Sequence, residues 1–174
     1  MDDFEVFVRQ RSAALARTAY LLTGDRHLAE DLLQDTLARV AERWWAVVRG
    51  GDPEPYVRRM LYTRAIDGWR HRRRHAAATA AVAERPELQS PSDDAEIIAR
   101  RLVLRDALAR LTPRQRAVLV LRFYEDHTEV QTADLLGCSV NTVKSQTRHA
   151  LSRLRAVAPH LAETFDRPSP VETP

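Results

Sequence analysis

Apolar residues recur every three or four positions along most of this sequence, which is the spacing of amphipathic helices. In the first 75 residues this pattern predicts three helices. One covers about residues 3–22, a second runs without a break over about 26–48, and a third begins near Pro55. The glycine, aspartate and proline residues at 23–25 and 49–53 separate them.

The same helical spacing returns at residue 97 and continues to 111. Thr112 then supplies an N-cap residue, Pro113 suits the first position of a helix, and Gln115 completes a capping box. These signals predict a further helix that runs through Phe123.

Residues 128–155 carry the signals of a helix-turn-helix. Thr128 and Gln131 form a capping box at the start of a short helix, Gly137 can end that helix in the left-handed conformation, and Ser139 can cap the next one. The longer second helix has an apolar face, formed by Val140, Val143, Ala150, Leu151 and Leu154.

The opposite face of that longer helix is rich in hydrogen-bonding groups of the kind that contact base edges and phosphates in a major groove. The candidates for DNA contact are Ser139, Asn141, Thr142, Lys144, Ser145, Gln146, Arg148 and His149. The alternative is an ordinary helical hairpin whose polar face is merely solvated. Because the turn, the cap and the polar face coincide, the pattern favours DNA binding.

These elements predict an all-α protein of two small helical domains. Few glycines and aromatic residues and many alanines, leucines and arginines agree with this fold class. We expect one domain over residues 1–80, a flexible acidic linker over 81–95, a second domain over 96–162 and a disordered tail over 163–174.

Positive charge is concentrated between positions 49 and 75, where the sequence has eight arginines and three acidic residues. Tyr56, Tyr62 and Trp69 lie among these arginines. Aromatic side chains beside a basic strip suit a surface that stacks the bases of a separated strand and holds its backbone. For Tyr56 and Trp69 the alternative is a place in the core of the domain.

Several function classes find no support in the sequence. Cys138 is the single cysteine, so a disulfide framework and a cysteine zinc cluster are excluded, and a small apolar plug in the turn explains it better than a redox role. His71 and His75 have metal-ligand spacing but lie among arginines. No paired nucleophile and base or phosphate loop is present, so we expect neither an enzyme nor a bound cofactor or metal.

Targeting signals are also lacking. No apolar run reaches membrane-spanning length, and the first ten residues are acidic where a signal peptide is basic. The sequence therefore predicts a cytoplasmic protein without a membrane partner.

Three segments together resemble the extracytoplasmic-function sigma factors, the minimal relatives of sigma-70. They are AEDLLQDT at 29–36, PEPYVRRMLYTRAIDGWRHRRR at 53–74 and the segment LTPRQRAV to LSRLR at 111–155. The resemblance implies sigma regions 2 and 4, core RNA polymerase and promoter DNA as partners, a monomer when free, and regulation by an anti-sigma factor, as is frequent in the family.

The resemblance also implies roles for particular residues. The helix with Glu30, Asp31, Leu33, Gln34 and Asp35 would bind the coiled coil of the largest polymerase subunit, although acidic residues are also favoured near a helix N-terminus by the helix dipole. The second helix of the helix-turn-helix would read the minus-thirty-five element. The minus-ten element would contact Tyr56, Arg59, Tyr62, Thr63, Asp67, Arg70, Arg72, Arg73 and Arg74.

The chain departs from the family pattern at two places. Tyr62 and Thr63 stand where many relatives have Val-Asn, and Gln131-Thr132-Ala133 stands where many have Glu-Ile-Ala. A stand-alone helix-turn-helix regulator is the alternative function. It would require a dimer interface and usually a ligand pocket, and the sequence offers a candidate for neither.

Overall fold

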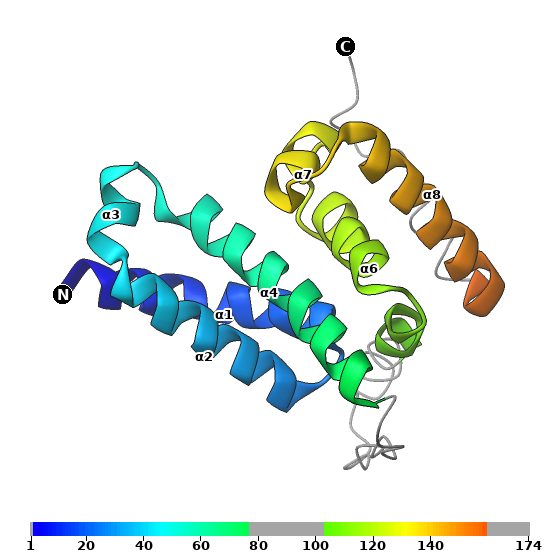
Figure 1. The fold of residues 1–174 in the computed structure, drawn as a ribbon, viewed down its shortest axis with the longest axis horizontal. Coiled ribbons are helices and arrows are strands. Elements are labelled where there is room, and N and C mark those ends of the chain that lie inside the picture. Colours follow the sequence, from blue (N-terminus) through cyan, green and yellow to red (C-terminus); the bar gives the residue numbers. More distant parts are fainter. Residues whose placement is uncertain (1, 77–102, 160–174) are drawn as a thin grey trace, which may run out of the picture.

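The computed structural model describes residues 2–76 and 103–159, with the side chains of 2, 70 and 72–76 left out. Within these ranges all regular structure is helical and forms two domains, as predicted (Figure 1). The expected linker at 81–95 and tail at 163–174 lie outside the described residues. None of the described helices has the length and apolarity that a membrane span requires.

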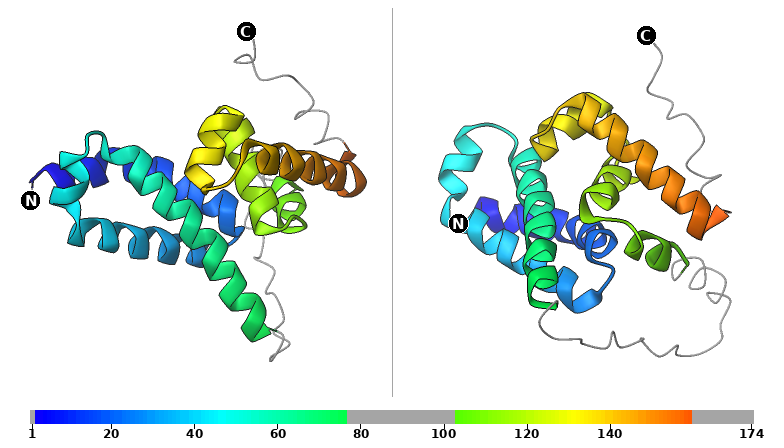
Figure 2. Two further views of the ribbon diagram at one scale, coloured as in Figure 1. Left: turned by 45° about the horizontal axis from the view of Figure 1, so that its top comes forward. Right: turned by 45° about the vertical axis from the view of Figure 1, so that its right-hand side comes forward.

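The N-terminal domain consists of four helices: α1 (Asp2–Thr23), α2 (Arg26–Glu42), α3 (Trp44–Arg49) and α4 (Pro53–Ala76). Between α1 and α2, Asp25 caps the second helix, because its carboxylate accepts a hydrogen bond of 2.8 Å from the Leu28 N–H. The helix α2 packs against both α1 and α4 (Figures 1 and 2).

The prediction of one unbroken helix over 26–48 is wrong. The backbone leaves helical geometry at Arg43, which has φ −121° and ψ 13°, and α3 begins at the next residue. This break lets Trp44 turn into the core, where its ring centroid lies 5.1 Å from that of Phe4 and 5.4 Å from that of Phe7. Burial of a tryptophan among aromatic rings compensates for the interrupted helix.

The core of the N-terminal domain forms where α1, α2 and α4 meet. Val40, Val57 and Leu61 have no exposed surface there, and Leu15 is 1% exposed. Val57 and Leu61 are four residues apart, so one face of α4 supplies both.

The C-terminal domain contains a helical segment at 103–109, then α6 (Pro113–Leu119), the π-helical turn η1 (Val120–Tyr124), α7 (Glu129–Leu136) and α8 (Val140–Val157). Both predicted capping boxes are confirmed, at Thr112 and at Thr128. Gly137 ends α7 with φ 61°, in the left-handed region as predicted.

The two domains pack against each other through α4, which contacts both α6 and α7. Tyr62 lies at the centre of this contact, with no exposed surface, in an apolar cluster with Leu22, Val120 and Leu121. Tyr62 is only one position beyond Leu61, so neighbouring side chains of α4 enter two different cores. The helix is thus shared between the domains.

A polar junction flanks this apolar contact. The Glu125 carboxylate of the C-terminal domain accepts hydrogen bonds from the Thr18 hydroxyl, at 2.6 Å, and from the Arg58 guanidinium. Burial alone would lower the pKa of Arg58, but the carboxylates of Glu125 and Glu54 raise it above its ordinary value. These contacts tie α1 and α4 to the end of η1.

A second polar contact crosses the domain boundary nearby. The buried Arg116 guanidinium donates to the Leu22 carbonyl at 2.7 Å and to the Leu108 carbonyl at 2.9 Å. Arg116 of α6 thus donates a hydrogen bond to the Leu22 carbonyl at the end of α1, and a buried carbonyl requires such a donor.

Removing the Glu125 carboxylate should loosen the contact between the domains. Glu125→Ala is expected to weaken it by about 1.5–3 kcal/mol, because two hydrogen bonds that involve a charged group are lost. Dyes attached at Arg9→Cys and Arg153→Cys, in a Cys138→Ser background, report the urea concentration at which energy transfer between the domains falls. That midpoint should decrease.

Glu129→Ala is the matched control for this experiment. Glu129 also pairs with a cation, Lys144, but within the C-terminal domain. Equal midpoints for Glu125→Ala and Glu129→Ala would contradict the proposed importance of the junction.

Alkaline pH should also separate the domains. Burial, together with the nearby Glu125 charge, raises the pKa of Tyr62 well above 10.0. The neutral phenol thus stabilises the packed arrangement fully below about pH 10, and this contribution is lost as pH rises through the raised pKa. The same dyes should show a lower urea midpoint above pH 10.

Tyr62→Phe should remove this alkaline effect, since the phenylalanine ring fills the same buried position and has no hydroxyl to ionise. Tyr124→Phe, at a half-exposed tyrosine, should keep the effect. An identical alkaline decrease in the Tyr62→Phe protein would show that another group is responsible.

Candidate nucleic-acid interface

The helix α8 is held with one face inward and one face outward. Val143, Ala150 and Leu154 are buried, as predicted. The turn before α8 is closed by Ser139, whose hydroxyl accepts a hydrogen bond of 3.2 Å from the Thr142 N–H. Cap and core together fix the rotation of α8 about its axis.

The predicted DNA-contacting residues of α8 lie on the outward face or at its border. Ser139, Asn141, Lys144, Arg148 and His149 are exposed, whereas Thr142, Ser145 and Gln146 are half-buried. The Lys144 ammonium, which is exposed, lies 3.5 Å from the carboxylate of the half-buried Glu129, and water screens this pair. The surface is thus free to exchange this contact for a phosphate.

The turn of the helix-turn-helix has its own small core. Ala133 and Val143 are buried there against Val118, and the half-buried Cys138 packs beside them, in the apolar position predicted for it. The neighbouring Thr132 is fully buried with a hydroxyl that lacks a hydrogen-bond partner in the described part of the chain.

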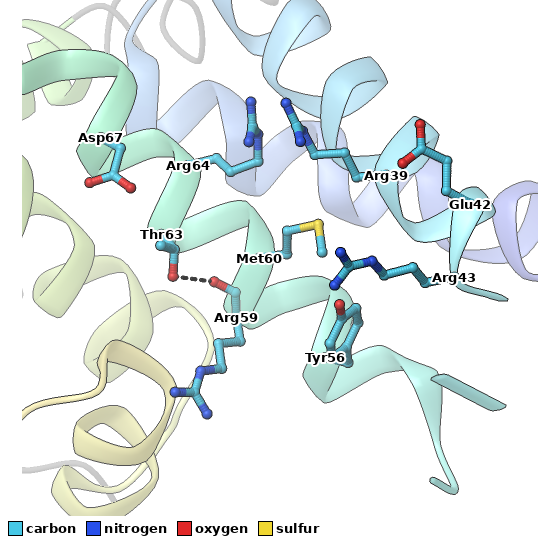
Figure 3. Close-up of a pocket in the computed structure, with 9 residues that line it drawn as sticks. All are labelled: Arg39, Glu42, Arg43, Tyr56, Arg59, Met60, Thr63, Arg64 and Asp67. Carbon is cyan, nitrogen blue, oxygen red and sulfur yellow. Dashed lines mark hydrogen bonds between the residues drawn. The ribbon is translucent and has the colours of Figure 1, made fainter. Parts of the chain in front are cut away.

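A second polar surface lies on α4, on a different face from Tyr62 and its apolar cluster. Four of the predicted minus-ten residues line one open pocket of about 390 Å³ (Figure 3): Tyr56, Arg59, Thr63 and Asp67. They follow each other at intervals of three or four positions, so they form one stripe along the helix. The structure thus brings these four together.

Tyr62 is the predicted minus-ten residue that the structure separates from this stripe. It is fully buried against the C-terminal domain, so contact with DNA requires the two domains to move apart. The structure does not describe the side chains of four predicted minus-ten residues, Arg70, Arg72, Arg73 and Arg74. It also does not describe that of His75, one of the two histidines with metal-ligand spacing. Trp69 is half-buried, between the two alternatives considered for it.

The pattern of the sequence did not indicate the part of the pocket wall that lies on and just after α2. The lining is completed by Arg39 and Glu42 of α2, by Arg43 directly after α2, and by Met60 and Arg64 of α4. Arg39 and Arg43 are spaced by four residues and continue the face that begins at Asp35, but such spacing is common on solvated helices. Only the packing of α2 beside α4 distinguishes them.

The five residues predicted to bind polymerase differ in how accessible they are. Asp31 and Gln34 are exposed, and neither makes a side-chain hydrogen bond or ion pair among the described residues. Glu30 is exposed and pairs with Arg26 at 3.0 Å. Leu33 is half-buried.

Asp35, the fifth of these residues, faces α4 instead. Its carboxylate pairs with Arg64 of α4 and, at 3.3 Å, with Arg39 of its own helix. A carboxylate engaged by two guanidinium groups is less available to another protein. The exposed acidic surface of α2 is therefore smaller than the sequence indicates.

The chemistry offered by these surfaces is hydrogen bonding, ion pairing and stacking. Within the described ranges, no group of three histidine, cysteine, aspartate or glutamate residues could hold a metal ion. Guanidinium groups, amides, hydroxyls and an accessible aromatic ring are the groups that contact phosphates and bases.

Comparison with known proteins identifies both domains. The chain matches sigma-70 region 2 over residues 7–75 and sigma-70 region 4 over residues 101–154. It is 41% identical over 154 residues to the RNA polymerase sigma-E factor of Streptomyces coelicolor, and the alignment covers 88% of this chain and 84% of that protein. It is 35% identical over 160 residues to the ECF RNA polymerase sigma factor SigL of Mycobacterium tuberculosis, and this alignment covers 89% of this chain and 88% of SigL.

Solved structures agree with this fold. The sigma factor RpoE, in complex with the anti-sigma factor NepR from Bartonella quintana, superposes with a TM-score of 0.67 at 23% identity, over 96% of this chain and 100% of that one. CnrH, in complex with the cytosolic domain of CnrY, superposes with a TM-score of 0.58 at 21% identity, over 90% of this chain and 87% of the CnrH chain. At these identities the likeness shows the fold alone.

None of these similarities supports the alternative of a stand-alone regulator, because the sigma-E and SigL relatives match across both domains. The chain belongs to the extracytoplasmic-function sigma factors of the sigma-70 family, the proteins that direct RNA polymerase to promoters.

Proposed function

We propose that this sigma factor divides promoter recognition between its two polar surfaces. The face of α8 reads the minus-thirty-five element as duplex, and the stripe on α4 holds the non-template strand of the minus-ten element once the strands separate. The observation that carries this proposal is the clustering of Tyr56, Arg59, Thr63 and Asp67 around one open pocket.

The groups on the two surfaces suit the two forms of DNA. Exposed Asn141 and His149 on α8 are side chains that hydrogen-bond base edges, and Lys144 and Arg148 are suited to phosphates. On α4, the residue Tyr56 is 37% exposed, so a base that has left the duplex can stack on its ring. Unpairing a base costs on the order of a few kcal/mol, and stacking and phosphate contacts offset this cost.

Tyr62 can contribute to the minus-ten surface only if the domains separate, because it is covered in the packed arrangement. Core polymerase supplies the scaffold that holds the two DNA readers at a fixed separation, which raises their combined affinity. We expect the free chain to be a cytoplasmic monomer that binds promoters weakly on its own. It acts by binding, in a family not known for enzymatic activity.

An inhibitory partner fits this scheme. RpoE was solved in complex with the anti-sigma factor NepR, and CnrH with the cytosolic domain of CnrY. We propose a protein of the anti-sigma class as a regulator of this chain, since a partner that favours the packed arrangement would keep Tyr62 covered.

Transcription in vitro tests the proposed function. The purified chain, added to core polymerase from the same bacterium and genomic DNA fragments, should produce discrete start sites that core polymerase alone does not. Aligned sequences upstream of these sites should share two elements. Absence of any specific start above the core background would refute the proposal, and specific footprints by the chain without polymerase would favour the regulator.

The exposed part of α2 should be required for assembly. Asp31→Ala combined with Gln34→Ala is expected to weaken binding to core polymerase about tenfold or more, equivalent to about 1.4 kcal/mol. The melting temperature should change little, because neither side chain has a partner within the described part of the protein. Titration of core polymerase with labelled chain measures the affinity.

The matched control replaces one acid and one amide on another helix, Glu5→Ala with Gln10→Ala, both exposed on α1. It should assemble normally. If the α2 double variant also assembles normally, the acidic residues serve only to stabilise the start of their own helix.

A further inference from the structure

The pocket beside α4 has a wall that belongs to α2. Its residues come from α2, from Arg43 directly after it and from α4, and none comes from the C-terminal domain. The pocket therefore stays open while Tyr62, on another face of α4, is covered. With about 390 Å³ it has room for a nucleotide-sized group.

The cations around this pocket are not equivalent. Arg39 and Arg64 both pair with the Asp35 carboxylate, which offsets part of their charge. Arg43 is exposed, and no carboxylate among the described residues forms an ion pair with it. Its guanidinium points toward Tyr56 and Met60 in Figure 3.

Arg59 is the other arginine of the lining without an ion pair among the described residues, but it points elsewhere. In Figure 3 its side chain extends away from Arg43. Its Nη2 atom would lie 3.8 Å from a Cβ atom placed on Gly137 at the end of α7. Arg59 thus faces the C-terminal domain, which leaves Arg43 as the cation available over the pocket.

The floor of the pocket suits a base. Tyr56 exposes its ring, and the half-buried Met60 supplies a polarizable thioether next to it. An aromatic face with an unpaired guanidinium beside it is the combination that binds a base by stacking and its phosphate by charge.

The backbone at Arg43 is firmly held even though its side chain is exposed. Its N–H donates to the Val40 carbonyl at 3.1 Å, and its carbonyl accepts from Ala46 at 2.9 Å and Val47 at 3.1 Å. Trp44, the next residue, is anchored in the core. The break between α2 and α3 thus presents Arg43 from an ordered backbone, so that binding does not have to order the main chain as well as the side chain.

We propose that Arg43 binds a backbone phosphate of the separated promoter strand, next to the base that stacks on Tyr56. This inference rests on the proposed function, because it requires that α4 holds a single strand. It adds a DNA-binding residue directly after α2, so that the proposed polymerase surface lies near the start of this helix and the DNA contact lies just beyond its end.

The experiment uses the holoenzyme and a fork-junction DNA, duplex upstream and single-stranded over the minus-ten element, taken from a promoter mapped as above. Arg43→Ala should weaken binding about fivefold to tenfold and reduce the slope of log affinity against log salt by about 1, as expected for one lost phosphate contact. Arg43→Lys should recover most of the affinity because it keeps the charge.

Arg9→Ala is the matched control. Arg9 is exposed on α1 in the same domain and does not line the pocket, so its removal deletes the same charge without changing affinity or slope. Melting temperatures of all variants check that the break between α2 and α3 is intact.

Methylphosphonate substitution locates the contact. Single-strand phosphates are made neutral one at a time in the fork-junction DNA. At one position the neutral phosphate should lower the affinity of the wild-type holoenzyme and leave the affinity of the Arg43→Ala holoenzyme unchanged. At the other positions the two holoenzymes should respond alike.

Two results would overturn the inference, and they differ in what they say about the function. If the wild-type holoenzyme binds and initiates normally but Arg43→Ala behaves like Arg9→Ala, the Arg43 contact is refuted and the proposed function stands. If the wild-type holoenzyme produces no specific start, both are refuted together.

Discussion

The structure depends on how one helix, α4, divides its circumference among three environments. Val57 and Leu61 enter the core of the N-terminal domain, Tyr62 enters the apolar cluster shared with the C-terminal domain, and the stripe from Tyr56 to Asp67 remains open. A helix offers about 100° per residue, so adjacent positions serve different neighbours. A change at one face of α4 therefore affects the position of the other two.

The contact between the domains combines an apolar centre with a polar edge. Tyr62 and Leu121 are fully buried, while Glu125 joins Thr18 and Arg58 at the margin. Burying a carboxylate costs free energy that its partners largely offset, so such a junction adds specificity of placement more than stability. Each domain also has a cluster of buried apolar residues of its own.

The local signals were predictable because each involves residues only three or four positions apart. Thr112 and Thr128 were expected to cap their helices with a glutamine partner, and Gly137 was expected to adopt the left-handed conformation, and all three predictions are confirmed. The inward residues Val143, Ala150 and Leu154 follow from periodicity in the same way. The interruption of the second helix was missed, because the tryptophan that causes it packs on phenylalanines from α1.

The sequence by itself thus determined the all-α class, the helix-turn-helix, the basic aromatic helix and, through resemblance, the family. Only the tertiary structure decided which of the candidate residues are available. Asp35 is occupied by Arg64, Tyr62 is covered, and Arg43, directly after another helix, joins the pocket. The physical reason is distance along the chain: Glu125 contacts Arg58 across 67 positions and Thr18 across 107, and no periodicity within a helix encodes which remote side chain will meet it.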